Sequence, residues 1–173
     1  MKSIIAMMLL LIGLSASSQI RLENVRFDAH IYTEPQHFIS IGDWKGDGFN
    51  IGAGIEYQSN IVYVKAQTYY FPDLKGIDYL DLGGAFGFNW QSHMRYWRTY
   101  IGFTGGRIWR NGTGDYAYLG AETGIDYYFN GYMGNGLFMG IQSSVTSSTD
   151  SKYYSNDETI TRWNVGLRIG YTF

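Results

Sequence analysis

The 173-residue sequence contains no cysteine and only two prolines. Without cysteine, the fold has no disulfide bond, no thiolate metal site and no lipid attached through a thiol. Charged residues make up only 16% of the chain, and they form no basic stripe that would neutralise phosphates. Nucleic acid is therefore excluded as a partner. After residue 18, no stretch shows a helical period of useful length, so a helical domain is not expected.

The first 18 residues have the pattern of a secretory signal peptide. Lys2 supplies a short positive start, an apolar run follows from Ile4 to Leu14, and small residues precede Gln19. The run is too short for a transmembrane helix. We therefore expect residues 1–18 to be cleaved and residues 19–173 to form one domain.

The rest of the chain is rich in glycine and aromatic residues, with 22 of the 23 glycines and all 16 tyrosines, and its apolar residues recur with a period of two. In the segment 49–58, for example, Phe49, Ile51 and Ile55 alternate with small and polar residues. Such alternation predicts β-strands with one apolar and one polar face. Eight segments show it, at roughly 22–32, 48–58, 60–71, 78–90, 96–108, 116–129, 136–146 and 160–173.

The length of these strands, and the order of aliphatic and aromatic residues along them, indicate that they cross a membrane. Ten or eleven residues at about 3.3 Å each, tilted by about 40°, cover roughly 25–28 Å, which is the hydrocarbon thickness of an outer membrane. In the last segment, Trp163 stands at one end and Tyr171 and Phe173 at the other, with aliphatic residues between them. Aliphatic centres with aromatic ends are typical of strands that cross two membrane interfaces.

The opposite face carries the charged residues. Alternate residues of a strand face opposite sides of the sheet, so parity, the odd or even position of a residue in its strand, gives its face. Parity assigns four acids and four bases to the interior: Glu56, Lys65, Asp81, Arg98, Glu122, Asp126, Arg162 and Arg168. Buried charges are tolerable when they are paired, and glycines on the same face leave room for long side chains. We therefore predict an all-β fold, an eight-stranded antiparallel up-and-down transmembrane β-barrel with a filled polar lumen. Ion pairs, rather than an open pore, are expected inside it.

The connections alternate between short and long. Long connections follow the odd-numbered strands, and we expect them to be extracellular, since periplasmic turns are short. They hold Trp44, Trp109, Tyr153 and Tyr154, which either form a binding surface or rest on glycolipid headgroups. No cofactor and no metal site is predicted from their sequence.

With this signal peptide, these eight segments and the terminal strand Trp163–Phe173, the sequence resembles the small eight-stranded outer-membrane barrel proteins of Gram-negative bacteria. The resemblance implies a location in the cell outer membrane, in contact with its lipid and glycolipid. In that family the barrel-assembly machinery reads a C-terminal strand that ends in phenylalanine with an aromatic residue two positions earlier. The resemblance therefore implies that Tyr171 and Phe173 are an assembly signal.

The resemblance implies function less closely than fold, because members of the family have several roles. We expect a non-enzymatic protein that is structural or that binds a surface partner, as yet unknown, through its extracellular loops. An accessory subunit of an envelope secretion or assembly complex is the main alternative, and a small-solute channel or a lipid-modifying enzyme is less favoured. A balanced lumen argues against a channel. His30 is expected to be a satisfied lumen histidine, and Ser40 with His37 is the one pair considered for acyl chemistry.

Overall fold

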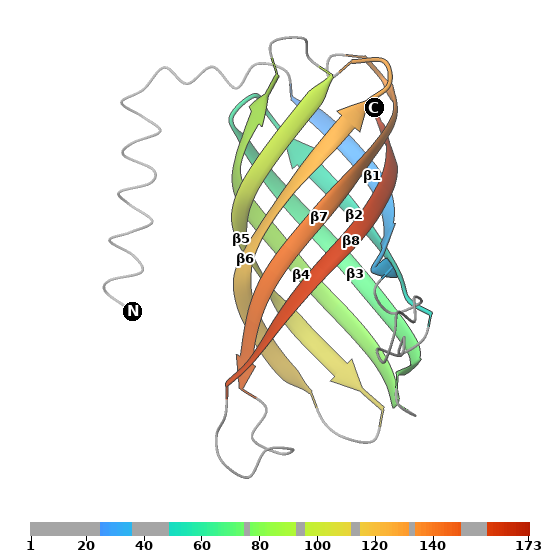
Figure 1. Ribbon diagram of the computed structural model, residues 1–173, viewed down its shortest axis with the longest axis vertical. Helices are drawn as coiled ribbons and strands as arrows, with labels where there is room; N and C mark the ends of the chain where they lie inside the picture. The colour runs from blue at the N-terminus through green and yellow to red at the C-terminus, as the bar shows by residue number, and fades with distance from the viewer. Residues whose placement is uncertain are drawn as a thin grey trace, which may run out of the picture.

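The computed structural model describes residues 25–35, 49–74, 77–92, 96–111, 115–131, 134–149 and 159–173. These residues form eight strands: β1 (Arg26–Thr33), β2 (Ile51–Gln58), β3 (Val62–Leu74), β4 (Ile77–Gln91), β5 (Trp97–Arg110), β6 (Tyr116–Tyr128), β7 (Gly136–Thr149) and β8 (Thr159–Thr172). Each strand pairs antiparallel with its neighbours in sequence, and β8 pairs with β1, so the sheet is a closed barrel (Figure 1). The predicted all-β barrel is confirmed.

The pairing of β1 with β8 closes the barrel. Its register runs from Asp28 opposite Thr172 to Thr33 opposite Leu167, and the amide of Phe173 donates to the carbonyl oxygen of Phe27 at 2.9 Å. A sheet in lipid requires such closure, because the bilayer core offers no partner to an open strand edge. We call the end of the barrel that holds Phe173 the turn end, and the opposite end the loop end.

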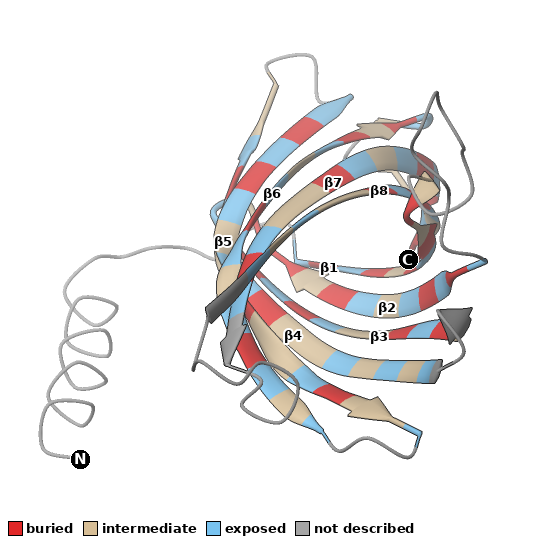
Figure 2. Ribbon diagram, turned by 60° about the horizontal axis from the view of Figure 1, so that its bottom comes forward, coloured by how far each residue is buried: buried red, intermediate tan, exposed pale blue. Residues whose placement is uncertain are grey.

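Burial alternates along every strand, as the bands in Figure 2 show. The outward side chains are large and apolar, and those of Phe103 and Leu119 are 66% and 76% exposed. Aromatic pairs collect on this face near the turn end, where the rings of Phe27 and Tyr57 lie 5.2 Å apart. In the described part of the chain, no helix is long and apolar enough to cross a membrane. An exterior this apolar is compatible with a lipid solvent and not with water, so we treat the strands as membrane-spanning.

Several strand boundaries differ by a few residues from the sequence-based expectation, including the start of β2 and the end of β5. β2 begins at Ile51 rather than at residue 48, because the Asn50 side chain bonds to the backbone of Glu34 instead of continuing the ladder. β5 continues to Arg110, which places Trp109 in a strand and not in a loop. β1 and β2 have only eight residues each, whereas the other strands have 13 to 15.

Some rows of residues that run across neighbouring strands have a long side chain at each end and inward-facing glycines between them. The two long side chains contact each other over the glycines. Tyr63 of β3 is followed across the sheet by Gly87, Gly102 and then Glu122, and the Tyr63 hydroxyl donates to Glu122 Oε1 at 2.8 Å. Gly124 lies in the same way between Tyr100 and Gln142, Gly140 between Asp126 and Arg168, and Gly52 between the stacked rings of Tyr32 and Tyr69. The absent side chains leave the space through which the long residues reach their partners.

This arrangement predicts a specific cost for adding one methyl group. In Gly102→Ala, the new Cβ would overlap the Tyr63 hydroxyl and the carbonyl oxygen of Phe86. We expect the free energy of unfolding to fall by about 1–3 kcal/mol, the usual range for overpacking. Urea titration in lipid vesicles measures the change. Gly166→Ala is the matched control on the same face, because its Cβ would meet nothing nearer than 3.3 Å. Equal losses in both variants would contradict the proposed role of Gly102.

Candidate functional site

Four charged side chains from four strands meet in the lumen, and we call them the ion ring: Glu56 of β2, Arg98 of β5, Asp126 of β6 and Arg168 of β8. Each arginine contacts both acids. Arg98 bonds to Glu56 and lies 3.1 Å from Asp126 Oδ2, whereas Arg168 lies 3.2 Å from Glu56 Oε2 and 2.8 Å from Asp126 Oδ1. All four side chains have no exposed surface.

The ion ring is electrically neutral, and this makes its burial tolerable. Two carboxylates and two guanidinium groups cancel in charge, and each carboxylate accepts hydrogen bonds from two arginines. The strand register supplies the geometry, since Arg98 lies opposite Asp126, and Arg168 reaches Asp126 across Gly140. The ring therefore links opposite walls of the barrel and fills the lumen between them.

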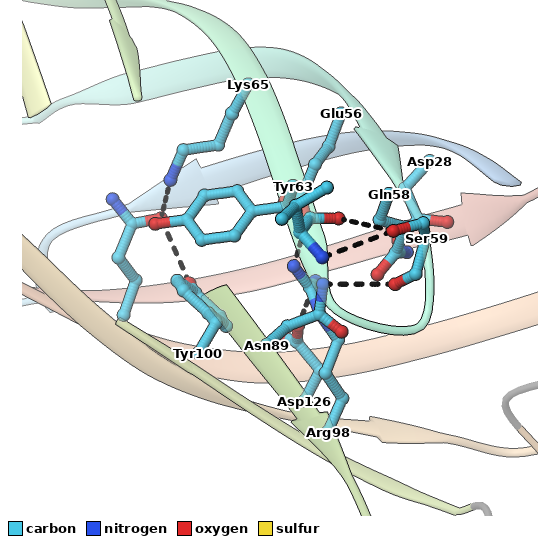
Figure 3. Close-up of polar contacts among 12 residues, drawn as sticks. Asp28, Glu56, Gln58, Ser59, Tyr63, Lys65, Asn89, Arg98, Tyr100 and Asp126 are labelled. Atoms are coloured by element: carbon cyan, nitrogen blue, oxygen red, sulfur yellow. Dashed lines mark hydrogen bonds and ion pairs between the residues drawn. The ribbon is translucent and has the colours of Figure 1, made fainter. Parts of the chain in front are cut away.

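A second group of polar contacts lies beside the ion ring (Figure 3). Lys65 pairs with Glu122 at 2.8 Å and donates to Gln142 Oε1 at 2.9 Å. The Tyr100 ring lies among three cations: the guanidinium carbons of Arg98 and Arg168 are 4.7 Å and 5.3 Å from its centroid, and Lys65 Nζ is 5.7 Å away. Aromatic faces attract cations, so this ring stabilises the charges that it separates.

The turn end of the lumen is closed by a third group. Gln58 and Tyr128 both donate to Asp28 Oδ2, the tyrosine hydroxyl at 3.1 Å. Arg26 donates to the carbonyl oxygen of Gly134 at 3.3 Å, in the connection between β6 and β7. Three successive layers of bonded side chains therefore occupy the turn-side part of the barrel.

The loop-side part of the lumen is different, because it contains a cavity of about 50 Å³ that we call the cup. Its lining includes Tyr32, Tyr69, Tyr118, Gln67, Asp81 and Arg162. The Tyr32 and Tyr69 rings stack at 4.7 Å, and the Tyr118 hydroxyl donates to Asp81 Oδ1 at 2.9 Å. Gln142, which bonds to Lys65 and Glu122, also lines the cup and separates it from the charged layers.

The predicted lumen residues divide between these places. The ion ring and the Lys65–Glu122 pair hold six of them, and the cup holds Asp81 and Arg162. Arg162 was expected to pair with a lumen acid, but no acid among the described residues lies within ion-pair distance of it. It lies on β8 beyond the ion ring, where the lining of the lumen holds five tyrosines and only two acids, Glu34 and Asp81.

The residues predicted for the loops and the C-terminal signal lie in different parts of the chain, and only some of them are described by the structure. Trp109 faces outward from β5, with the Arg107 guanidinium carbon 5.8 Å from its ring, so it lies on the barrel wall and not in a loop. Trp44, Tyr153 and Tyr154 lie outside the described residues, as do the predicted signal peptide, Ser40 and His37. Tyr171 and Phe173 face outward with their rings 5.1 Å apart, and their role as an assembly signal stays a prediction.

Sequence reasoning missed the aromatic content of the lumen. Tyr63, Tyr100, Tyr128 and Phe138 are each at most 1% exposed, although aromatic residues were assigned mainly to the lipid face. The available signal was parity, because Tyr63 shares its face with Lys65, and Tyr100 with Arg98. His30 does face the lumen, but neither ring nitrogen has a hydrogen-bond partner among the described residues, contrary to the expectation of a satisfied histidine.

Comparison with known proteins agrees with this architecture. The crystal structure of neisserial surface protein A superposes with a TM-score of 0.58 at 11% sequence identity, over 86% of this chain and 96% of that chain. The chain has the fold of the small eight-stranded outer-membrane barrels. The N-terminal β-barrel domain of Pseudomonas aeruginosa OprF is also similar, with a TM-score of 0.48, 14% identity, and coverage of 86% of this chain and 96% of that chain. No protein-family model and no curated protein matches the sequence.

Proposed function

We propose that this protein is an integral barrel of the cell outer membrane that passes no solute, catalyses no reaction and acts as a structural or surface-binding protein through its loop end. The ion ring carries this proposal. Its four side chains have no exposed surface, and they come from β2, β5, β6 and β8, so they span the lumen. An eight-stranded barrel is just wide enough for side chains to fill it, and in the turn-side part of this lumen they do so.

Conductance measurements test the closed lumen directly. The folded protein, inserted into a planar lipid bilayer, is expected to show no steady ionic current, because neither water nor ions find a continuous path through the three layers. A shift in gel mobility on heating establishes that the inserted sample was folded. Stepwise openings that persist with the folded protein would contradict the proposal and favour a small-solute channel.

A surface-binding role requires a partner outside the barrel wall. Co-purification in mild detergent, followed by mass spectrometry, separates a barrel that works alone from one docked in an envelope complex. Replacing Trp44, Tyr153 and Tyr154 together by serine is the informative variant, because these residues belong to the long connections predicted to be extracellular. A partner that is retained by this variant as well as by the parent would argue against the loop aromatics as its binding surface.

A further inference from the structure

The cup is the part of the lumen that the closed-barrel proposal does not use. Its volume of about 50 Å³ corresponds to roughly three to five water-sized groups, at about 10–15 Å³ each. The charged layers end below it, and the lining residues come from both walls of the barrel. A cavity of this size admits the end of an unbranched ligand but not a whole sugar ring.

Arg162 and Asn164 supply donor groups on the β8 side of the cup. The tyrosines of the cup instead offer acceptors and aromatic rings. The hydroxyl groups of Tyr32, Tyr69 and Tyr118 already donate to Thr68, Asn50 and Asp81 respectively. A tyrosine whose only hydroxyl hydrogen is used in this way presents to a ligand its ring and the oxygen lone pairs that remain. The ring faces attract positive charge.

Two acceptors stand next to each other on one wall of the cup. Gln67 Oε1 is buried and has no hydrogen-bond partner among the described residues. Asp81 receives a hydrogen bond from Tyr118 at 2.9 Å, and no base in the described part of the chain pairs with its carboxylate. Asp81 lies opposite Tyr69 in the register of β3 and β4, so Gln67 is its diagonal neighbour on the same face. Buried acceptors are ordinarily satisfied, so Gln67 Oε1 lacks a donor that a ligand could supply, and the neighbouring Asp81 carboxylate can accept further hydrogen bonds.

We propose that the cup binds a primary ammonium group carried on a short unbranched chain. The ammonium would donate to the Asp81 carboxylate and to Gln67 Oε1, with the tyrosine rings around its carbon chain. A charged donor fits this site better than a neutral one, because a carboxylate, a carbonyl oxygen and aromatic faces all favour positive charge. Arg162 of β8 lines the same cup, but among the described residues it forms no ion pair with Asp81, so no cation directly contacts the Asp81 carboxylate. This inference is independent of whether the barrel conducts.

Calorimetric titration of the folded barrel in zwitterionic micelles tests the proposal, with propylammonium as the probe. Mildly alkaline buffer keeps an ordinary carboxyl ionised and the amine protonated. Propanol, tetramethylammonium and sulfate are the comparison ligands: the first lacks the charge, the second lacks N–H donors, and the third would bind through Arg162. We expect saturable binding of propylammonium and at least about tenfold weaker binding of the other three.

Variants then locate the binding. Asp81→Asn is expected to weaken propylammonium binding by about tenfold or more, and Gln67→Met by a smaller factor, because the methionine keeps the length of the side chain but not its acceptor. Asp115→Asn is the matched control, since it removes the same charge outside the cup, where Asp115 pairs with Arg107 at 2.6 Å. Circular dichroism shows whether each variant is folded.

Each result of these titrations either supports or contradicts the ammonium site. Binding that Asp81→Asn weakens and Asp115→Asn preserves supports the proposal. If propanol binds as well as propylammonium, if sulfate binds in its place, or if the folded parent shows no saturable heat at all, the proposal is wrong. A blocked lysine amide and a free diamine, titrated in parallel, distinguish a peptide side chain from a free amine as the source of the ammonium group.

Discussion

Arg98→Met is expected to lower the free energy of unfolding by about 3–5 kcal/mol. Arg98 has no exposed surface and contacts both Glu56 and Asp126. Without it, two buried carboxylates share the single guanidinium of Arg168, and one negative charge stays uncompensated. Methionine fills much of the arginine volume, so the loss measures the charge rather than a cavity.

A second substitution distinguishes this electrostatic cause from a packing cause. In Arg98→Met with Glu56→Gln, the ion ring is neutral again, and much of the lost stability should return. Arg107→Met is the control for the same change on the outer face, where the Arg107 side chain is 60% exposed, and its cost should stay below about 1 kcal/mol. Urea titrations in lipid vesicles of Arg98→Met, Glu56→Gln, the double variant and Arg107→Met give the four values. A double variant as unstable as the two single losses combined would show that the charge balance is not what stabilises the lumen.

The barrel could be predicted from the sequence because the lipid outside it and the polar lumen inside it require very different side chains. Lipid requires apolar side chains on one face of every strand, and a closed lumen requires paired polar side chains on the other, so the alternation is strong along the whole chain. Glu56, Arg98, Asp126 and Arg168 all followed from parity alone. The strand ends were harder to predict. Asn50 ends the hydrogen-bond ladder of β2 through side-chain bonds to Glu34, and no local sequence pattern indicates these bonds.

The contacts inside the lumen could not be predicted, because they depend on register. Parity states that Tyr63 and Glu122 face the lumen, but only the pairing of β3, β4, β5 and β6 places them on one row with Gly87 and Gly102 between them. Register depends on turns and on long-range pairing, which a single sequence does not specify. Tyrosine adds to the difficulty, since its apolar ring suits lipid while its hydroxyl suits a polar interior.

The rows of glycine explain how so narrow a barrel holds such long side chains. A tyrosine or an aspartate reaches its partner two or three strands away by lying over glycine, as Tyr100 does over Gly124 toward Gln142. Each such contact links strands that are not neighbours. The lumen therefore works as a set of cross-links between walls, and stability inside the barrel depends on small residues as much as on charged ones.

Leu167→Arg is expected to cost about 2–4 kcal/mol, because it places a charge near the middle of the hydrocarbon layer. Leu167 lies near the centre of β8, faces outward and is 47% exposed. Thr161→Arg is the matched control on the same face of the same strand, close to the loop end, where an interfacial arginine should cost only about 0–1 kcal/mol. Unfolding titrations in vesicles compare the two. A Leu167→Arg protein as stable as Thr161→Arg would mean that this face of β8 does not meet lipid, and the assignment of both faces would then have to be reversed.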